Sequence, residues 1–292
     1  MMGGAAMKGR AEKKSHVAIA WRWEQFADVG STNAIAMEKV KTCWARGQPA
    51  EGIAVVARRQ TAGRGQHGRQ WESPPGGLYL SAVVENVPGP AREKLALLAG
   101  LAVVDALQDV DGYTDVDRAR RERWGVEAQI RWPNDVIVGG KKVAGILCEG
   151  LGQGDRWAAV IGVGVNVSTE QAEFSGAVAS RATSLWLHDG RARNMDGVGR
   201  AVLRCMDELL ILVRAEGMRP IIEKVGALDG LRGKRITFDA GVGNGGGGRE
   251  IFDAVAEGID ATGALVLRRI ETAAGGGLGA PQAFVNGSVL AE

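Results

Sequence analysis

The chain has 292 residues, of which 45% are hydrophobic and 24% charged, so it is long enough for a large core and, at roughly 150 residues per domain, for two domains. Its formal net charge of +2 is too small to indicate a nucleic-acid partner. No apolar run approaches the ~20 residues that span a membrane. Three widely spaced cysteines without C-x-x-C spacing predict reduced thiols and a cytoplasmic protein.

The first segment, residues 1–16, is basic and rich in small residues but lacks the apolar core of a secretory signal. We expect a disordered tail. Its basic character leaves organelle targeting open as the alternative.

Strands and helices are expected to alternate along residues 17–230. Apolar residues at helical spacing from Ala36 to Trp44 place Gly30-Ser31-Thr32-Asn33 at a helix N-terminus, where hydroxyls can cap the helix and also face a ligand. Further helices are expected at 92–110 and 195–225. Strands are expected at 17–24, 52–57, 78–84, 128–132, 136–138, 141–148 and 158–167.

The pattern changes at residues 231–292. Short strands are expected at 234–238, 250–258, 264–268 and 283–289, joined by glycine-rich connections at 241–248 and 275–280. Several close strands of this length predict a small β-barrel as a second domain. The glycine runs are interpreted as linkers without chemistry.

Residues 58–77 form a loop rich in glycine and arginine between two expected strands. Four arginines precede the first carboxylate, Glu72, and guanidinium forks match carboxylate and phosphate oxygens. Gly63, Gly65 and Gly68 also satisfy G-x-G-x-x-G, but Pro74 and the residues around it forbid the helix that a dinucleotide fold requires. A solvated basic loop is the remaining alternative to an anion site.

Two other segments of the expected sheet are candidates for a site. Asn134 and Asp135 follow a proline, which suits a turn as well as a site. Gly162 and Gly164 interrupt an apolar strand, as is typical where something must approach the backbone, although a simple strand irregularity explains them too. With Lys142, these segments supply hydroxyl, amide, cationic and carboxylate groups that suit a reaction between two anions.

These motifs, in this order, resemble those of the biotin protein ligase family. The resemblance implies an α/β (α+β) catalytic domain of the class II aminoacyl-tRNA synthetase type over residues 17–230, with a mixed sheet and flanking helices. It also implies that residues 231–292 form an SH3-like barrel. The motifs are Gly30-Ser31-Thr32-Asn33, Gln60-Thr61-Ala62-Gly63-Arg64-Gly65-Gln66-His67-Gly68-Arg69-Gln70-Trp71, Trp132-Pro133-Asn134-Asp135, Lys142-Val143-Ala144-Gly145-Ile146-Leu147 and Gly162-Val163-Gly164-Val165-Asn166.

The resemblance implies a reaction in two steps. Biotin and ATP give biotinyl-5′-AMP and pyrophosphate, and biotin then passes to a lysine of a biotin carboxyl carrier domain of a carboxylase. Lys142, Arg64 and Asp135 would be catalytic, with Asp135 orienting the cations or holding Mg²⁺. Biotin would meet Ser31, Thr32, Asn33, Gln60, Arg64, Gly65, Gln66, Lys142, Gly145, Gly162 and Gly164, and ATP would meet Arg64, His67, Arg69, Trp71, Asn134 and Asn166.

The resemblance has departures and competitors. Family members often carry basic residues where this chain has Gln66 and His67, so the loop is less positive here and weaker retention of the acyl-adenylate is expected. Arg131 stands where lysine is common and is assigned no catalytic role. A lipoate or octanoate ligase and an inactive biotin-binding protein are the alternatives. Neither a membrane nor a specific nucleic acid is expected as partner, and a homodimer is left open.

Overall fold

The computed structural model describes residues 18–108, 125–242, 249–271 and 277–292. The tail expected at residues 1–16 lies outside these ranges, as does most of the glycine run at 241–248. No helix within the described ranges is both long and apolar enough to cross a bilayer.

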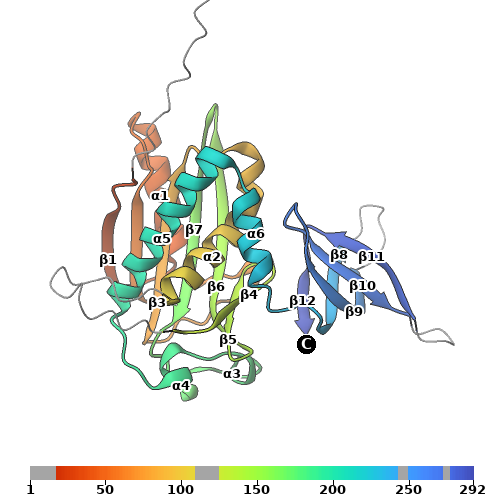
Figure 1. Ribbon diagram of the computed structural model, residues 1–292. Coiled ribbons are helices and arrows are strands. Elements are labelled where there is room, and N and C mark those ends of the chain that lie inside the picture. The colour runs from red at the N-terminus through yellow and green to blue at the C-terminus, as the bar shows by residue number, and fades with distance from the viewer. Residues whose placement is uncertain (1–17, 109–124, 243–248, 272–276) are drawn as a thin grey trace, which may run out of the picture.

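Seven strands form one mixed sheet in the order β1-β2-β3-β7-β6-β5-β4 (Figure 1). β1 and β2 pair in parallel, and the other neighbours pair antiparallel. The mixed sheet expected from the sequence is confirmed, although β1 begins five residues later than the strand expected at 17–24. The strands are β1 (Arg22–Val29), β2 (Ile53–Gln60), β3 (Gly77–Glu85), β4 (Ala128–Arg131), β5 (Asp135–Val138), β6 (Lys141–Gln153) and β7 (Arg156–Asn166).

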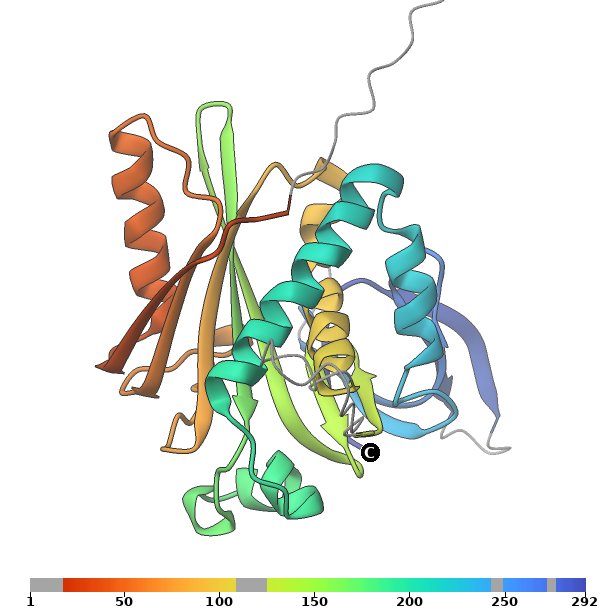
Figure 2. The same ribbon diagram turned by 60° about the vertical axis from the view of Figure 1, so that its left-hand side comes forward.

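Helices cover the two faces of this sheet unequally. Figure 2 shows α1 (Thr32–Ala45) on one face and α2 (Leu95–Gln108), α5 (Met195–Glu216) and α6 (Arg219–Ala227) on the other. The short helices α3 (Val178–Arg181) and α4 (Leu185–Asp189) lie beyond one end of the sheet, below it in Figure 1. Short 3₁₀ helices lie at η1 (Gln66–Gly68), η2 (Gly89–Lys94) and η3 (Gln171–Glu173).

The helix expected over 195–225 is two helices. The Asn194 side chain caps the start of α5 by accepting hydrogen bonds from the backbone N–H groups of Asp196 and Gly197. Gly217, with φ of +79°, ends α5, and Pro220 lies in the first turn of α6, where its missing N–H costs nothing.

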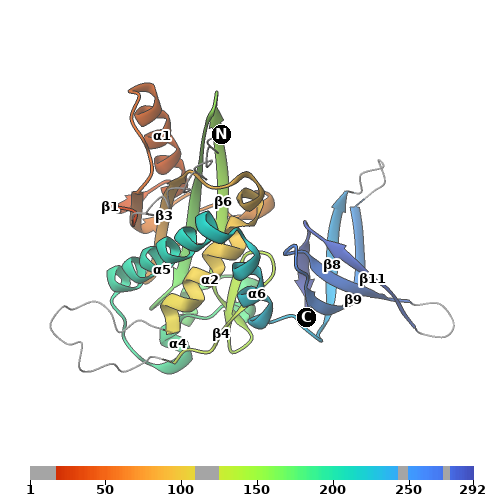
Figure 3. The same cartoon turned by 45° about the horizontal axis from the view of Figure 1, so that its top comes forward.

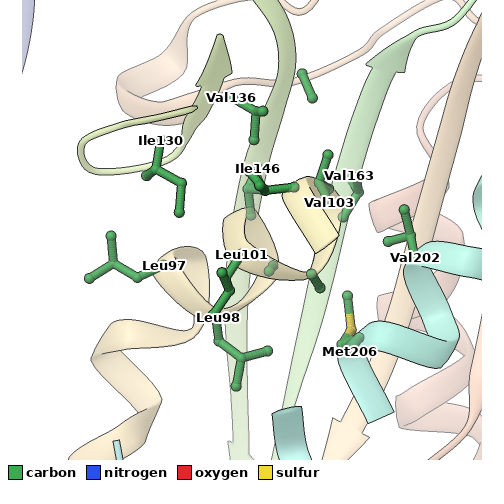
Figure 4. Close-up of a cluster of buried hydrophobic side chains, with 14 of the residues drawn as sticks. Leu97, Leu98, Leu101, Val103, Ile130, Val136, Ile146, Val163, Val202 and Met206 are labelled. Atoms are coloured by element: carbon green, nitrogen blue, oxygen red, sulfur yellow. The ribbon is translucent and has the colours of Figure 1, made fainter. Parts of the chain in front are cut away.

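The main core lies between the sheet and α2 and α5. Alternate strand residues point to opposite faces, and the odd-numbered valines of β7 join the core on the α2 side. Figure 4 shows Ile146 and Val163 of the sheet with Leu98 and Leu101 of α2 and Met206 of α5. A smaller cluster packs α1 against the opposite face. Because α1 covers only part of that face, the rest is free to form a site.

The C-terminal strands form a separate five-stranded antiparallel sheet in the order β11-β10-β9-β8-β12. No ladder joins β11 to β12 in the part of the chain that the structure describes, so closure into a barrel stays a prediction, as does the domain boundary near residue 230. The strands are β8 (Arg235–Val242), β9 (Arg249–Ile259), β10 (Leu265–Ile270), β11 (Leu278–Phe284) and β12 (Ser288–Ala291).

The single strand expected at 283–289 is wrong. β11 ends at Phe284 and β12 begins at Ser288, with the chain turning at Gly287, which has a φ of +144° that L side chains rarely adopt. The glycine run at 275–280 is also partly strand, since β11 begins at Leu278.

The C-terminal sheet packs beside α6 (Figure 3), and Arg131 at the end of β4 donates to the Val289 carbonyl of β12. Its buried residues Phe238, Leu265 and Leu267 belong to the same core cluster as α2. Trp132 connects the two sheets, because its Nε1 donates to the Gly263 carbonyl at 3.1 Å and its ring lies 6.2 Å from that of Phe238. The second sheet therefore packs against the end of the first that carries Asp135.

Candidate functional site

A hollow opens on the α1 face of the large sheet, beside the N-terminus of α1. Gly145 of β6 and Gly162 and Gly164 of β7 have no side chains to fill this face. Their neighbours Ile146 and Val163 point to the other face and pack in the core. The resulting pocket encloses about 140 Å³. The glycines expected to admit a ligand therefore form the floor of a pocket.

Hydrogen bonds fix the α1 end of the pocket. The Gln60 side-chain oxygen accepts from the backbone N–H of Thr32 at 2.8 Å and from its hydroxyl at 3.1 Å, and the Gln60 amide donates to Ser73. The Ser81 hydroxyl donates to Asn33 Oδ1 at 2.5 Å and lies 2.8 Å from the Thr32 hydroxyl. Thr32 and Asn33 belong to the first turn of α1 and Ser81 to the middle of β3, so this end of the pocket is preorganised.

The glycine and arginine loop folds back over the pocket as a narrow turn. Gly65 N donates to Arg69 O at 2.7 Å and Trp71 N donates to Gly63 O at 3.0 Å. A Cβ at Gly63 would lie 2.5 Å from the Trp71 carbonyl oxygen, so glycine is needed there for close approach of the backbone. Arg64, Gly65, Gln66, Arg69 and Trp71 line the pocket as a result.

The Trp71 ring lies directly on the glycine floor. A Cβ at Gly145 or at Gly164 would come within 2.6 Å of this ring. The Lys142 ammonium lies 5.0 Å from the ring centroid, a cation–π distance. The indole Nε1 is buried without a hydrogen-bond partner in the described structure. Trp71 thus occupies floor space that a flat or extended ligand would use.

Lys142 and Asp135 form an ion pair at the other end of the pocket, with 2.6 Å between Nζ and Oδ1. Lys142 follows the turn between β5 and β6, and Asp135 begins β5, where the Asn134 amide donates to the Ile146 carbonyl at 2.7 Å. The Lys142 side chain is 30% exposed, so its amine can meet a ligand. Within the described residues, no group of three or more His, Cys, Asp or Glu side chains could hold a metal by itself.

Arg64 reaches the pocket from the loop and pairs with Glu149 of β6, with 2.8 Å between Nη2 and Oε2. Lys142 and Arg64 line the same pocket. A reaction between two anions requires such an arrangement, because the cations must offset the repulsion between the reactants.

The C-terminal sheet closes one edge of the pocket. Ser288 and Val289 of β12 line it together with Arg131. Arg131 donates to the Val289 carbonyl at 3.4 Å, and its Nε lies 2.9 Å from a carboxylate oxygen of Glu292. Residues from both sheets therefore contribute to the same pocket.

Two ionisable groups near the pocket stay protonated near neutral pH. Burial, followed by the charge of Glu173, raises the pKa of Tyr79 above its usual value, and the Tyr79 hydroxyl donates to the Pro74 carbonyl at 2.6 Å. Burial, followed by the charge of Glu149, raises the pKa of Cys148 to about 12. Neither group is suited to act as a nucleophile.

Most of the predicted site residues lie together, and two do not. His67 is exposed in the loop with φ of +56° and is absent from the pocket lining. Asn166 is buried, and its amide donates to the Thr183 carbonyl at 3.0 Å. The predicted site residues that line the pocket are Ser31, Thr32, Asn33, Gln60, Arg64, Gly65, Gln66, Arg69, Trp71, Asn134, Asp135, Lys142, Gly145, Gly162 and Gly164.

Several contributors to the site were not predicted from the sequence. Ser81 and Glu149 hold the α1 end and the loop, and Ser288 and Val289 form the edge supplied by the second sheet. The position of Glu149 could have been found from strand alternation, since it lies four residues after Gly145 on the same face of β6. Arg131, to which no role was assigned, also lines the pocket.

Comparisons with known proteins identify similar chains. Residues 30–166 match the model of the biotin/lipoate A/B protein ligase family. A biotin–[acetyl-CoA-carboxylase] ligase from Paracoccus denitrificans is 36% identical over 223 residues, covering 73% of this chain and 83% of the relative. The bifunctional ligase/repressor BirA of Bacillus subtilis is 34% identical over 174 residues, and this chain spans only 50% of its length.

Solved structures share the fold. The biotin protein ligase from Aquifex aeolicus, in complex with biotin and ATP, has a TM-score of 0.67 at 24% identity. The match covers 92% of this chain and 99% of that one, so the likeness extends over both sheets.

Proposed function

The chain belongs to the biotin protein ligase family, and on that premise we propose that it is an ATP-dependent biotin–protein ligase. In this proposal biotin and ATP react to biotinyl-5′-AMP and pyrophosphate, and biotin then passes to a lysine of a carboxylase's biotin carboxyl carrier domain. The observation that carries the proposal is the convergence of Lys142 and Arg64 on one pocket with the N-terminus of α1.

The physical difficulty of the first step is charge. The biotin carboxylate must approach an α-phosphorus surrounded by negative oxygens, and two unit charges ~4 Å apart repel by about 4 kcal/mol at an effective dielectric near 20. Lys142 at one end and Arg64 on the loop would offset this repulsion and stabilise the charge that develops on the oxygens. Both cations line the pocket, where Lys142 pairs with Asp135 and Arg64 with Glu149, so their pairing and not their position would have to change during the reaction.

We assign the uncharged end of biotin to the hydroxyl and amide groups beside α1, from Ser31, Thr32, Asn33 and Gln60. Its tail would cross the floor formed by Gly145, Gly162 and Gly164, with the carboxylate directed to Lys142. The close contacts of Trp71 with this floor mean that its ring must move when biotin binds. A displaced Trp71 would then be free to cover the adenine of ATP.

The other ATP contacts are proposed for Arg69 and Asn134, which line the pocket. His67 and Asn166 keep their predicted roles only if the loop and the end of β7 rearrange when ATP binds. Mg²⁺ normally keeps several waters and binds through one or two carboxylates and the substrate phosphates. Asp135 fits as one such carboxylate, although Lys142 holds it in the described structure. Bound Mg²⁺ would supply further positive charge at the phosphates.

The decisive measurement is biotin-dependent ATP–pyrophosphate exchange. We expect exchange with the wild type and a loss of about 100-fold or more in Lys142→Ala, the scale on which removal of one preorganised electrostatic group acts. Lys141→Ala is the matched control, since Lys141 is the exposed neighbour on the same strand, and it should retain activity within about twofold.

A second arm separates the two substrates of the family. Wild-type protein, ATP and a carrier domain are incubated with labelled biotin or labelled lipoate, and label on the carrier is counted. Transfer of biotin alone supports the proposal. Transfer of lipoate alone would assign the chain to the lipoate branch, and biotin binding without pyrophosphate exchange would assign it to the inactive binding proteins.

A further inference from the structure

Glu149 joins three segments of the pocket through one carboxylate oxygen. Its Oε2 accepts a hydrogen bond from the Asn33 amide at 2.7 Å and from the Arg64 guanidinium at 2.8 Å. Asn33 lies in the first turn of α1, Arg64 on the loop and Glu149 on β6. The Glu149 side chain is 26% exposed, so it lies at the inner end of the ion pair, whereas Arg64 is 48% exposed.

The contact with Glu149 determines which way the Asn33 amide points. An amide offers an oxygen that accepts and an NH₂ group that donates. The Asn33 NH₂ donates to Glu149, and at 3.4 Å to the Leu147 carbonyl, while Oδ1 accepts from Ser81. A Cβ at Gly162 would lie 2.4 Å from Oδ1, so the oxygen is directed over the glycine floor. By holding the Asn33 NH₂ group, Glu149 makes Asn33 present its acceptor oxygen, and not its donor, to the pocket.

The same carboxylate determines where the Arg64 guanidinium stands. Glu149 takes a single Nη2 donor, and a guanidinium carries five N–H groups in a rigid plane. Anchoring one corner of this plane leaves the opposite edge for a carboxylate or phosphate. An ion pair this exposed adds little to folding stability, so its effect is expected in ligand binding and not in unfolding.

We propose that Glu149 is a positioning residue that orients Asn33 toward the uncharged end of biotin and Arg64 toward the anionic groups of the substrates. The inference rests on the proposed function, since it specifies which part of the two substrates each partner serves. A carboxylate would repel these anions if it were alone, but Arg64 balances its charge. One residue thus serves two recognition tasks that differ in chemistry, and they can be separated by substitution.

The variants Glu149→Gln and Glu149→Ala separate the contact with Asn33 from the contact with Arg64. Glutamine keeps an oxygen that can accept from the Asn33 amide but loses the charge that holds Arg64, whereas alanine loses both. Biotinamide, which is neutral, reports the uncharged end of biotin without contact between a carboxylate and Arg64. Its dissociation constant is measured by calorimetry, and the KM for ATP is measured by pyrophosphate exchange.

We expect Glu149→Ala to weaken biotinamide binding about 10-fold and Glu149→Gln to restore it to within about threefold of wild type, because the hydrogen bond to Asn33 is regained. Both variants should raise the KM for ATP, by about fivefold or more, because both lose the charge-assisted contact with Arg64. Asp155→Asn, at the turn between β6 and β7, is the matched control and should change neither quantity.

Equal biotinamide affinity in wild type and Glu149→Ala would overturn the proposal, as would a Glu149→Gln variant with an unchanged KM for ATP. If the alanine variant does not fold, the glutamine variant still decides through the ATP measurement. A wild type that lacks exchange and does not bind biotin would instead overturn the proposed function, so the two failures are distinct.

Discussion

The two sheets of the molecule differ in how much of each strand is buried. Every residue of β3, an interior strand of the seven-stranded sheet, is buried, whereas β9 of the C-terminal sheet is half-exposed and β11 mostly exposed. The large sheet has helices on both faces, and the small one packs through one face alone. A site that must hold charges at fixed distances is built mainly on the sheet whose strands are held on both sides, and the other sheet contributes one edge.

The largest effect should come from the core of the large sheet. Leu98 on α2 is fully buried, so Leu98→Ala should lower the free energy of unfolding by about 2–5 kcal/mol through lost burial and the cavity left behind. Ile251 on β9 is 51% exposed, and Ile251→Ala should cost less than about 0.5 kcal/mol. Chemical denaturation of both variants tests the comparison, and similar losses would contradict it.

A smaller effect is expected at the junction of the sheets. Trp132→Phe keeps a ring near Phe238 but leaves the buried Gly263 carbonyl without its donor, which should cost about 1–3 kcal/mol. Trp186→Phe is the control, because Trp186 is 42% exposed. Urea unfolding monitored by circular dichroism gives both values. If the two substitutions cost the same, the indole of Trp132 does not couple the sheets.

The smallest effect concerns acid stability of the C-terminal sheet. A hydrogen bond from the Arg249 guanidinium holds the pKa of Asp239 below its ordinary value of 3.8. A lowered pKa in the folded state stabilises the fold above the ordinary pKa, and this contribution is lost as pH falls below about 4. Urea midpoints of Asp239→Asn and wild type should therefore differ most at pH 7, and the difference should shrink as pH falls below about 4. A difference that does not change with pH would refute this assignment.

The sequence predicted the strands and helices best where local pattern and burial agree. The expected helix from Thr32 onward and the strand at 158–167 match α1 and β7 closely, since apolar spacing there is clear. Boundaries failed where a single glycine decides the backbone, as at Gly217 and Gly287. The turn at Gly287 splits one expected strand into two, and strand-forming residues on both sides hide it.

The site was predictable as a set of residue types and not as a set of contacts. Glycines within the strands, with lysine and aspartate at strand ends, indicated a pocket, and most of them line it. The pairing of Arg64 with Glu149 joins positions 85 residues apart, which no local pattern contains. Asn166 belongs to the same motif as Gly162 and Gly164, yet its amide donates a hydrogen bond to the Thr183 carbonyl in the segment after β7.

The Trp71 ring on the floor of the pocket has a consequence for how tightly any ligand can be held. A molecule that lies across Gly145 and Gly164 can enter only after the indole has swung out. Its apparent dissociation constant is the intrinsic constant divided by the fraction of molecules with the ring displaced. The Trp71 ring therefore competes with the ligand for the same space, and its preference for the floor sets the ligand concentration at which the pocket begins to fill.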